Sequence, residues 1–295
     1  MNETKVQRNY KDSLFCMLFK DKENLLSLYN ALNKTNYTDA DKLEITTLEN
    51  AVYMNYKNDV SFVFDFELML YEHQSTVNPN MPLRDLFYVA DILQKRTYGQ
   101  DLYGLKMVLI PSPQFVVFYN GTDSQPERQT IRLSDAYEKK PDTSGLELVV
   151  TVYNINYGYN EEIMDACRTL KEYAMYVERV RTYSKLIPIA EAVEKAVDEC
   201  ISKDILSEFL GKNRAEAIKV SIYEYDEELH FKTLFNEGME AGIEQERKQG
   251  EIRLTRVNKL HSILIDQGRL DDLKRATQDK VYQEQLMIEL LSEEI

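Results

Sequence analysis

KNDVSFVFDFELMLYEHQST, residues 57–76, is the stretch of sequence around which the fold can be predicted. Two runs rich in Val, Phe, Leu and Tyr flank a short polar group, and this pattern predicts a β-hairpin. If Asp65 and Phe66 form a two-residue turn, Asp59 on the first strand faces Glu72 on the second. Asp-Phe is an unusual turn, because such hairpins prefer Asn-Gly or Asp-Gly, and a shift of one residue would send Asp59 to the other face of the sheet.

The expected hairpin places two carboxylates in one small patch. Strand side chains alternate between faces, so Glu72 and Gln74 project together while His73 points the other way. Facing residues have Cβ atoms roughly 5 Å apart, which puts Asp59 beside Glu72. Two carboxylates so close to apolar strands repel each other and resist desolvation unless a cation lies between them. Mg²⁺ suits such a pair, and the chemistry indicated is phosphodiester hydrolysis; a solvated carboxylate pair at a sheet edge is the alternative.

The same residues resemble the motif of the PD-(D/E)XK nuclease superfamily, in which an Asp on one strand is followed by Glu-x-Lys on the next. The pattern is most similar to the branch of Rpn-type recombination-promoting nucleases and PD-(D/E)XK transposase-like proteins, in which Glu-x-Gln replaces Glu-x-Lys. Asp59 and Glu72 match the acidic motif positions, and Gln74 matches the position usually held by lysine. The segment DSLFCMLFKDKENLLSLYNAL, residues 12–32, resembles the first helix of that branch, with Asp12 near the place of an additional acidic residue.

This resemblance covers roughly the first 200 residues and implies an α/β fold, a PD-(D/E)XK nuclease-like mixed sheet flanked by helices. It also implies a metal-dependent DNA endonuclease linked to recombination or mobile elements. In such an enzyme Asp59 and Glu72 would ligate Mg²⁺ or Mn²⁺, and Gln74 would orient water or substrate. The missing lysine has a chemical cost, because glutamine offers only a neutral carbonyl and amide to the transition state. We therefore expect slow cleavage or a stronger dependence on the metal.

The net charge argues against a protein that coats nucleic acid through bulk electrostatics. The chain of 295 residues carries a formal charge of −14. Residues 1–160 hold 16 basic and 21 acidic side chains, and residues 161–295 hold 20 and 29, which gives −5 and −9. Most of the excess negative charge therefore lies in the C-terminal part. A nuclease needs positive charge only around its cleft, so DNA remains the expected partner.

The cysteines and histidines show no zinc pattern. Cys16, Cys167 and Cys200 lie far apart within apolar helical patterns, which indicates buried reduced thiols in a cytoplasmic protein. The three histidines have no ligand spacing, so we expect no zinc site. The apolar runs are short and the N-terminus lacks an apolar signal core, so we expect neither a membrane span nor secretion.

Around the hairpin, the sequence predicts helices and strands in an α/β order. Leucines at helical spacing predict two helices within 10–32, separated by KDKEN. Asp12 is either the N-cap of the first helix, which we favour, or a metal ligand. Further strands are expected at 106–110, 115–119 and 147–156, and the polar segment 122–145 is expected to be loops around the short piece RLSDAYE.

A helix is predicted directly after the motif. Pro82 is well placed to start it at LRDLFYVADILQKR. Its expected buried stripe consists of Leu83, Leu86, Phe87, Ala90 and Leu93. Arg84 lies in the first turn and is a candidate contact for a substrate phosphate, although a solvated or salt-bridged arginine is the commoner case.

From Asn160 onward the pattern is almost wholly helical, with two short helices in 259–294. We expect a PD-(D/E)XK nuclease-like domain at 1–205 and an acidic α-helical C-terminal extension at 206–295. The C-terminal helices are the candidate surface for a homo-oligomer. The alternative function is a catalytically silent module that binds protein partners through its acidic helical tail. The missing lysine and the lack of a clear basic groove favour this alternative.

Overall fold

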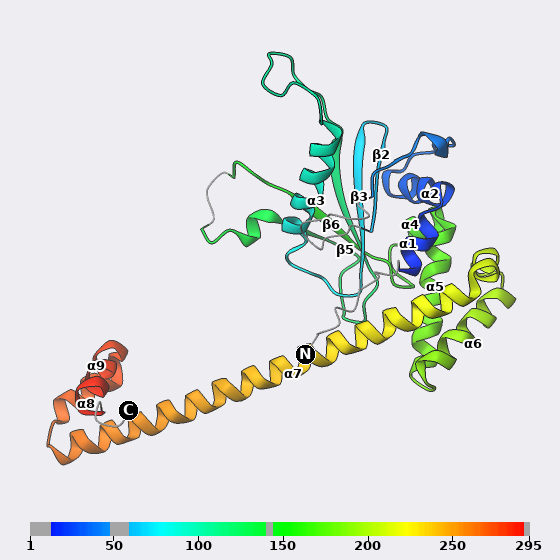
Figure 1. The fold of residues 1–295 in the computed structure, drawn as a ribbon. Coiled ribbons are helices and arrows are strands. Elements are labelled where there is room, and N and C mark those ends of the chain that lie inside the picture. Colours follow the sequence, from blue (N-terminus) through cyan, green and yellow to red (C-terminus); the bar gives the residue numbers. More distant parts are fainter. Residues whose placement is uncertain (1–12, 48–58, 140–143, 292–295) are drawn as a thin grey trace, which may run out of the picture. The chain divides into compact units, whose positions relative to one another are not determined.

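The computed structural model describes residues 13–47, 59–139 and 144–291, and its centre is a mixed six-stranded sheet of order β1-β2-β3-β4-β6-β5 (Figure 1). The strands are β1 (Glu44–Ile45), β2 (Val60–Phe64), β3 (Glu67–Gln74), β4 (Ser112–Tyr119), β5 (Arg128–Arg132) and β6 (Val149–Asn154). β3, β4 and β6 are parallel, whereas the β1–β2, β2–β3 and β5–β6 pairs are antiparallel. Because helices flank this sheet, the expected α/β class is confirmed.

The β2–β3 hairpin has the register that the sequence predicts. Val60 faces Tyr71, which leaves Asp65 and Phe66 as the two turn residues. Their φ angles are 46° and 65°, as a type I′ turn requires. The Tyr37 hydroxyl donates a hydrogen bond of 2.5 Å to Asp65 Oδ2. This tertiary contact holds a turn that lacks the usual glycine.

Each face of the sheet has its own apolar core, because β3 sends alternate side chains to opposite sides. Met69 and Tyr71 belong to one core, and Leu68 and Leu70 to the other. The first core also takes side chains from the helices α1 (Leu14–Phe19), α2 (Lys22–Asn33), α4 (Glu161–Ala166), α5 (Arg168–Ser184) and α6 (Ile189–Ser202). The second core lies under α3 (Met81–Arg96), on the other side of the sheet in Figure 1. Strands covered on both faces read as continuous apolar runs.

Two segments differ from the predicted strands and loops. Residues 106–110 form no strand, and the side chains of Met107 and Leu109 are exposed. An apolar run becomes a strand only when a neighbouring strand pairs with its backbone. Conversely, the segment 122–145, predicted as loops, contains β5 and the 3₁₀ helix η2 (Leu133–Ala136). β5 pairs on one side with β6 and is largely polar, so hydrophobic periodicity does not reveal it.

The buried side of α3 also differs from the prediction. The helix contains Pro82 in its first turn, as expected. Of the predicted stripe, Leu83 and Phe87 are 41% and 42% exposed and Ala90 is exposed as well, while Leu86 and Leu93 are only partly buried. The side that faces the sheet carries Met81, Pro82, Asp85, Tyr88, Val89 and Ile92. Apolar residues occur on two sides of this helix, so the predicted stripe lay largely on the wrong side.

The two predicted N-terminal helices are present as α1 and α2. Asp12 lies outside the described residues, and α1 is capped by Ser13, whose Oγ accepts a hydrogen bond of 3.1 Å from the backbone N–H of Cys16. Asp21 caps α2 in the same way. All three cysteines are buried free thiols, as predicted.

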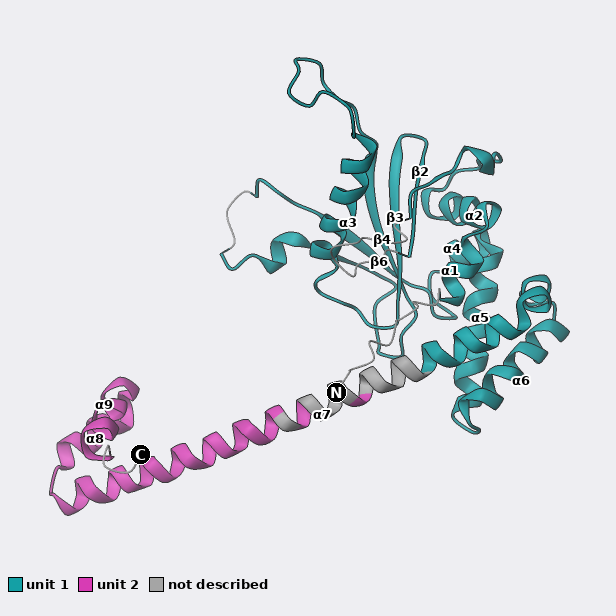
Figure 2. Cartoon of the chain, viewed as in Figure 1, with its two compact units in different colours: residues 1–226 teal, residues 227–295 magenta. Residues whose placement is uncertain are grey.

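The chain divides into two compact units, residues 1–226 and 227–295 (Figure 2). The boundary lies inside α7 (Ser207–Asp266), and buried side chains from the first part of α7, such as Leu210 and Val220, belong to the first core. In the second unit, α8 (Leu270–Gln278), α9 (Lys280–Leu291) and the end of α7 share a small core. No helix in the described part of the chain combines the length and hydropathy of a membrane-spanning segment.

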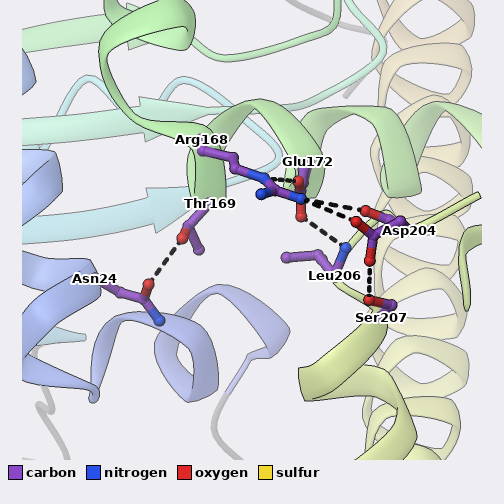
Figure 3. Close-up of polar contacts among 7 residues, drawn as sticks. All are labelled: Asn24, Arg168, Thr169, Glu172, Asp204, Leu206 and Ser207. Atoms are coloured by element: carbon purple, nitrogen blue, oxygen red, sulfur yellow. Dashed lines mark hydrogen bonds and ion pairs between the residues drawn. The ribbon is translucent and has the colours of Figure 1, made fainter.

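A polar network fixes the start of α7 to the first turns of α5 (Figure 3). Glu172 accepts a hydrogen bond of 2.7 Å from the backbone N–H of Leu206 and forms an ion pair with Arg168. Arg168 also lies 3.5 Å from Asp204 Oδ2, and the Ser207 hydroxyl donates a hydrogen bond to the other oxygen of Asp204. These contacts hold the loop before α7 against α5, within the first unit.

Candidate active site

The structure brings Asp59, Glu72 and Gln74 together at the open end of the β2–β3 hairpin, on the face covered by α3. The backbone N–H of Asp59 donates a hydrogen bond of 3.3 Å to Glu72 Oε1. Asp59 Oδ2 accepts one of 2.7 Å from the backbone N–H of His73, just beyond the last residues of the β2–β3 pairing. Asp59 and Glu72 therefore lie side by side, and the Asp59 carboxylate also caps the end of the strand pair.

Glu72 is an unusually buried carboxylate, with 4% of its surface exposed. Burial, and after it the neighbouring charges of Asp59 and Asp85, hold its pKa well above the usual range, against the opposing effect of Arg84. Such a group is expensive to keep ionised unless a positive charge lies nearby. The site therefore favours either a proton or a cation at Glu72.

Arg84, the candidate phosphate contact, lies in this site and forms an ion pair there, the commoner of the two expected cases. Its Nη2 is 3.8 Å from Glu72 Oε2 and donates a hydrogen bond of 3.1 Å to the Tyr88 hydroxyl. The Arg84 side chain is 31% exposed, so part of it is accessible from solvent. It can therefore pair with a carboxylate inside the site and still meet a ligand from outside.

Asp85 is the residue of the site that sequence reasoning missed. It is 1% exposed, and burial raises its pKa to about 7, with Arg84 opposing. No described residue forms a hydrogen bond with its Oδ1. The signal for it was present, because Met81, Asp85 and Tyr88 recur at helical spacing and a carboxylate in an apolar stripe is rarely buried without a partner.

Gln74 is the last residue of β3, and its side chain extends toward the start of α3. Its amide Nε2 is 2.7 Å from Met81 Sδ, and its Oε1 is buried without a hydrogen-bond partner among the described residues. Its strand end is held close to the end of β4, because the backbone N–H of Asn120 donates a hydrogen bond of 3.0 Å to the Gln74 carbonyl. Gly121 allows this approach, since a Cβ atom there would lie 1.7 Å from the carbonyl oxygen of Ser75.

His73 faces the opposite core and has a structural role. Its ring stacks on Phe15 at a centroid distance of 4.9 Å, and its Nε2 lies 2.9 Å from the Tyr173 hydroxyl. Burial lowers the pKa of His73 to about 3, with a smaller effect of Arg181. The imidazole is therefore neutral at physiological pH.

The oxygen atoms of the site fit a hard cation such as Mg²⁺ or Mn²⁺. Within the described residues, no group of three or more His, Cys, Asp or Glu side chains has the arrangement of a metal site. Mg²⁺ needs less, because it binds one or two carboxylates and completes its shell with waters and substrate oxygens. Among the described residues, Asp85 Oδ1 and Gln74 Oε1 are buried acceptors without donors, and such atoms favour a cation in their vicinity.

A scan against protein-family models and searches of curated proteins and of solved structures found no match to this chain. The arrangement of Asp59, Glu72 and Arg84 is therefore the ground on which a function can be assigned.

Proposed function

We propose that this protein is a metal-dependent DNA endonuclease of the PD-(D/E)XK type. The observation that carries the proposal is the contact between Asp59 and Glu72 at the open end of the hairpin, with Gln74 on the same strand face. The order of helix, hairpin, helix and parallel strand agrees with the resemblance of residues 57–76 to that superfamily.

Each residue has a role that its chemistry suits. Asp59 and Glu72 would hold Mg²⁺ or Mn²⁺, and Gln74 would orient a water molecule or the substrate through its amide. The bound metal would supply a water of lowered pKa and polarise a phosphoryl oxygen. Arg84, which is partly exposed and charged, would bind a phosphate of the DNA backbone.

Arg84 also bears on the missing lysine of the motif. Gln74 brings no charge to the transition state, whereas the guanidinium of Arg84 lies 3.8 Å from Glu72 and is held there by Tyr88. This arrangement supports a slow enzyme that depends strongly on its metal. Recombination or the movement of mobile elements is the proposed setting, and it rests on the resemblance alone.

The test is cleavage of supercoiled plasmid in Mg²⁺ and in Mn²⁺ by the wild type, Asp59→Asn and Glu72→Gln. Both substitutions remove the charge but keep an oxygen acceptor, so the amide oxygen introduced by Asp59→Asn can still accept from the His73 N–H. We expect both variants to lose activity by about 100-fold or more, a typical loss for a group that stabilises transition-state charge. Circular dichroism checks that they remain folded.

Glu67→Gln is the matched control, because Glu67 is a carboxylate on the same strand but at the turn end, where it accepts a hydrogen bond of 2.8 Å from Tyr29. It should cleave like the wild type. Equal cleavage by all four proteins would exclude Asp59 and Glu72 as the active site. No cleavage by the wild type under any metal condition would favour the second candidate, a silent interaction module, which the Glu-x-Gln motif already supports.

A further inference from the structure

The segment between α3 and β4 carries a large apolar surface that nothing in the described chain covers. In Figure 1 this loop, residues 97–111, extends past the end of α3 and away from the sheet. Its large side chains have exposed fractions from 50% for Ile110 to 108% for Leu105. The exposed residues of this loop are Tyr98, Leu102, Tyr103, Leu105, Met107, Leu109 and Ile110.

The area of this loop matches that of a stable protein interface. Tyr98 and Tyr103 are 91% and 101% exposed, and an aromatic side chain offers about 150–250 Å² for burial. These two residues alone approach half of the roughly 800 Å² per partner that a standard interface buries. The five exposed aliphatic residues add the remainder. An apolar surface of this size marks an interaction site in a folded protein.

The second half of the loop also has an unpaired backbone in the part of the chain that the structure describes. Within the described residues, no backbone hydrogen bond is made by residues 105–110, LKMVLI. Residues 106–110 of this run are predicted from the sequence to form a strand, and no strand of the described chain pairs with them. A second strand would satisfy its N–H and C=O groups and cover its side chains at the same time.

The charge of the loop indicates which partner fits. Residues 97–111 contain one acidic and one basic residue, Asp101 and Lys106, in a chain of net charge −14. DNA and other strongly charged partners are bound by clusters of opposite charge, which this loop does not have. Two copies of an acidic chain, in contrast, meet with least repulsion at a neutral apolar surface.

We propose that residues 97–111 are the contact between two copies of this chain. Two copies related by a two-fold axis would pair residues 105–110 antiparallel and bury the same apolar side chains from each copy. This inference does not depend on nuclease activity, because the loop leaves the sheet at the hairpin-turn end, where Ser112 pairs with Phe66, and the Asp59–Glu72 pair lies at the other end of β3.

The first experiment measures the mass of the full chain by light scattering over a range of concentrations. We expect a dimer for the wild type and a monomer for Leu105→Asp/Leu109→Asp and for Leu105→Lys/Leu109→Lys, with the dissociation constant raised at least about 100-fold. The aspartate variant adds negative charge to an acidic chain and the lysine variant adds positive charge. If both are monomeric, loss of apolar contact, and not repulsion between the two copies, is the cause. Leu186→Asp is the control, because Leu186 is also exposed, at 78%, but lies elsewhere.

The second experiment is cross-linking through an introduced cysteine. The three native thiols are buried, so Met107→Cys, which is exposed and close to the centre of the run 105–110, is expected to form an intermolecular disulfide under mild oxidation, whereas Leu186→Cys is not. A disulfide joins Cα atoms no more than about 7 Å apart, which only residues close to the two-fold axis satisfy. A wild type that is monomeric at about 100 µM would overturn the proposal. So would a dimer that survives both double substitutions but is lost in Ile243→Asp, because that result would place the contact on the C-terminal helices. Binding of a monomeric wild type to uncharged lipid vesicles through the loop would also overturn it.

Discussion

Two buried carboxyl groups, Glu72 on β3 and Asp85 on α3, lie close enough for the charge of Asp85 to act on Glu72. They are 4% and 1% exposed, and burial raises the pKa of both. Beneath the other face of the sheet, burial lowers the pKa of His73. Burial thus disfavours the charged form on both faces of the sheet. On the side of Glu72 and Asp85 this favours binding of a proton or a cation, and on the side of His73 it disfavours protonation.

The pH dependence of stability tests this for Asp85. Its pKa is about 7 in the folded protein and 3.8 in its ordinary state, so between these values the folded state binds more protons than the unfolded state. The contribution of Asp85 to the free energy of unfolding should then fall as the pH rises through this range and level off above about pH 7. Asp85→Asn should remove this contribution, while Glu72, whose pKa is also raised, adds its own pH dependence in both proteins. Between about pH 5 and 8.5 the variant should gain about 3 kcal/mol relative to the wild type.

The measurement is urea unfolding in metal-free buffer at several values between about pH 5 and 8.5, with the variant and wild type compared at each pH. Asp101→Asn is the control, because Asp101 is exposed. A difference between Asp85→Asn and wild type that stays constant over the range would contradict the expectation.

Sequence reasoning reached Asp59 and Glu72 but not Asp85, and the difference has a physical cause. Strand alternation and a two-residue turn are enough to place Asp59 opposite Glu72, because both rules act within a single short hairpin. Asp85 requires knowledge of which side of α3 faces the sheet. Leu83 and Phe87 on the opposite side are equally apolar, so periodicity alone cannot decide between the two.

At the scale of the elements, the turn of the β2–β3 hairpin is strained, because its two central residues are Asp65 and Phe66 and neither is a glycine. Type I′ turns need positive φ at both central residues, and Phe66, at 65°, has a Cβ atom that disfavours it. The Phe66 side chain is 86% exposed, so it contributes little packing to the fold in return. The turn therefore costs free energy that a glycine would not.

Phe66→Gly should consequently stabilise the protein by about 1 kcal/mol, since glycine adopts this conformation without the steric penalty. The midpoint of denaturant unfolding is the measurement. Phe66→Ala is the control that separates the backbone from the aromatic ring, because alanine loses the ring but keeps the Cβ atom. If alanine stabilises as much as glycine, exposure of the ring, and not the turn conformation, is the cause.

Other helices and strands show when a local sequence pattern is enough to predict an element and when it is not. α6 begins directly after Pro188, and its buried Val193, Ala196, Val197 and Cys200 recur at helical spacing, so its buried side can be recognised from hydrophobic periodicity. Residues 106–110 have the composition of a strand, but strand formation depends on a neighbour that a single chain does not provide. β5 is the reverse case, a polar edge strand that forms because β6 offers its backbone.

At the scale of the whole molecule, α7 belongs to both compact units. The resemblance over roughly the first 200 residues leads to an expected domain boundary at 205/206, whereas the compact units meet at 226/227. Buried side chains after residue 205 explain the difference: Leu206, Leu210, Ala217 and Val220 lie in the first core. The Tyr176 hydroxyl donates a hydrogen bond of 2.8 Å to Ser221, which is buried as well. The first part of α7 also carries acidic residues on its surface, so its net charge does not reveal that its other side is buried.

Truncation distinguishes the two boundaries. A chain of residues 1–226 keeps the first core complete and should unfold cooperatively, whereas a chain of residues 1–205 loses Leu206, Leu210 and Val220 from it. Burial of one such side chain contributes about 1.5–3 kcal/mol, so the three together reach about 5 kcal/mol or more. That loss is comparable with the whole stability of an ordinary domain, about 5–15 kcal/mol, and the shorter chain should not fold.

Thermal unfolding followed by circular dichroism, together with resistance to proteolysis, measures this. Leu210→Ala within residues 1–226 provides a graded case, with an expected loss of about 2–5 kcal/mol, because the cavity it leaves lies between α7 and the first core. If residues 1–205 unfold at the same temperature as residues 1–226, the first part of α7 is not required by the core. The boundary would then fall near residue 205, as the sequence predicts. If only the longer chain folds, the acidic extension begins after a segment that the α/β unit needs, and the catalytic and dimerisation tests should be made on chains that include it.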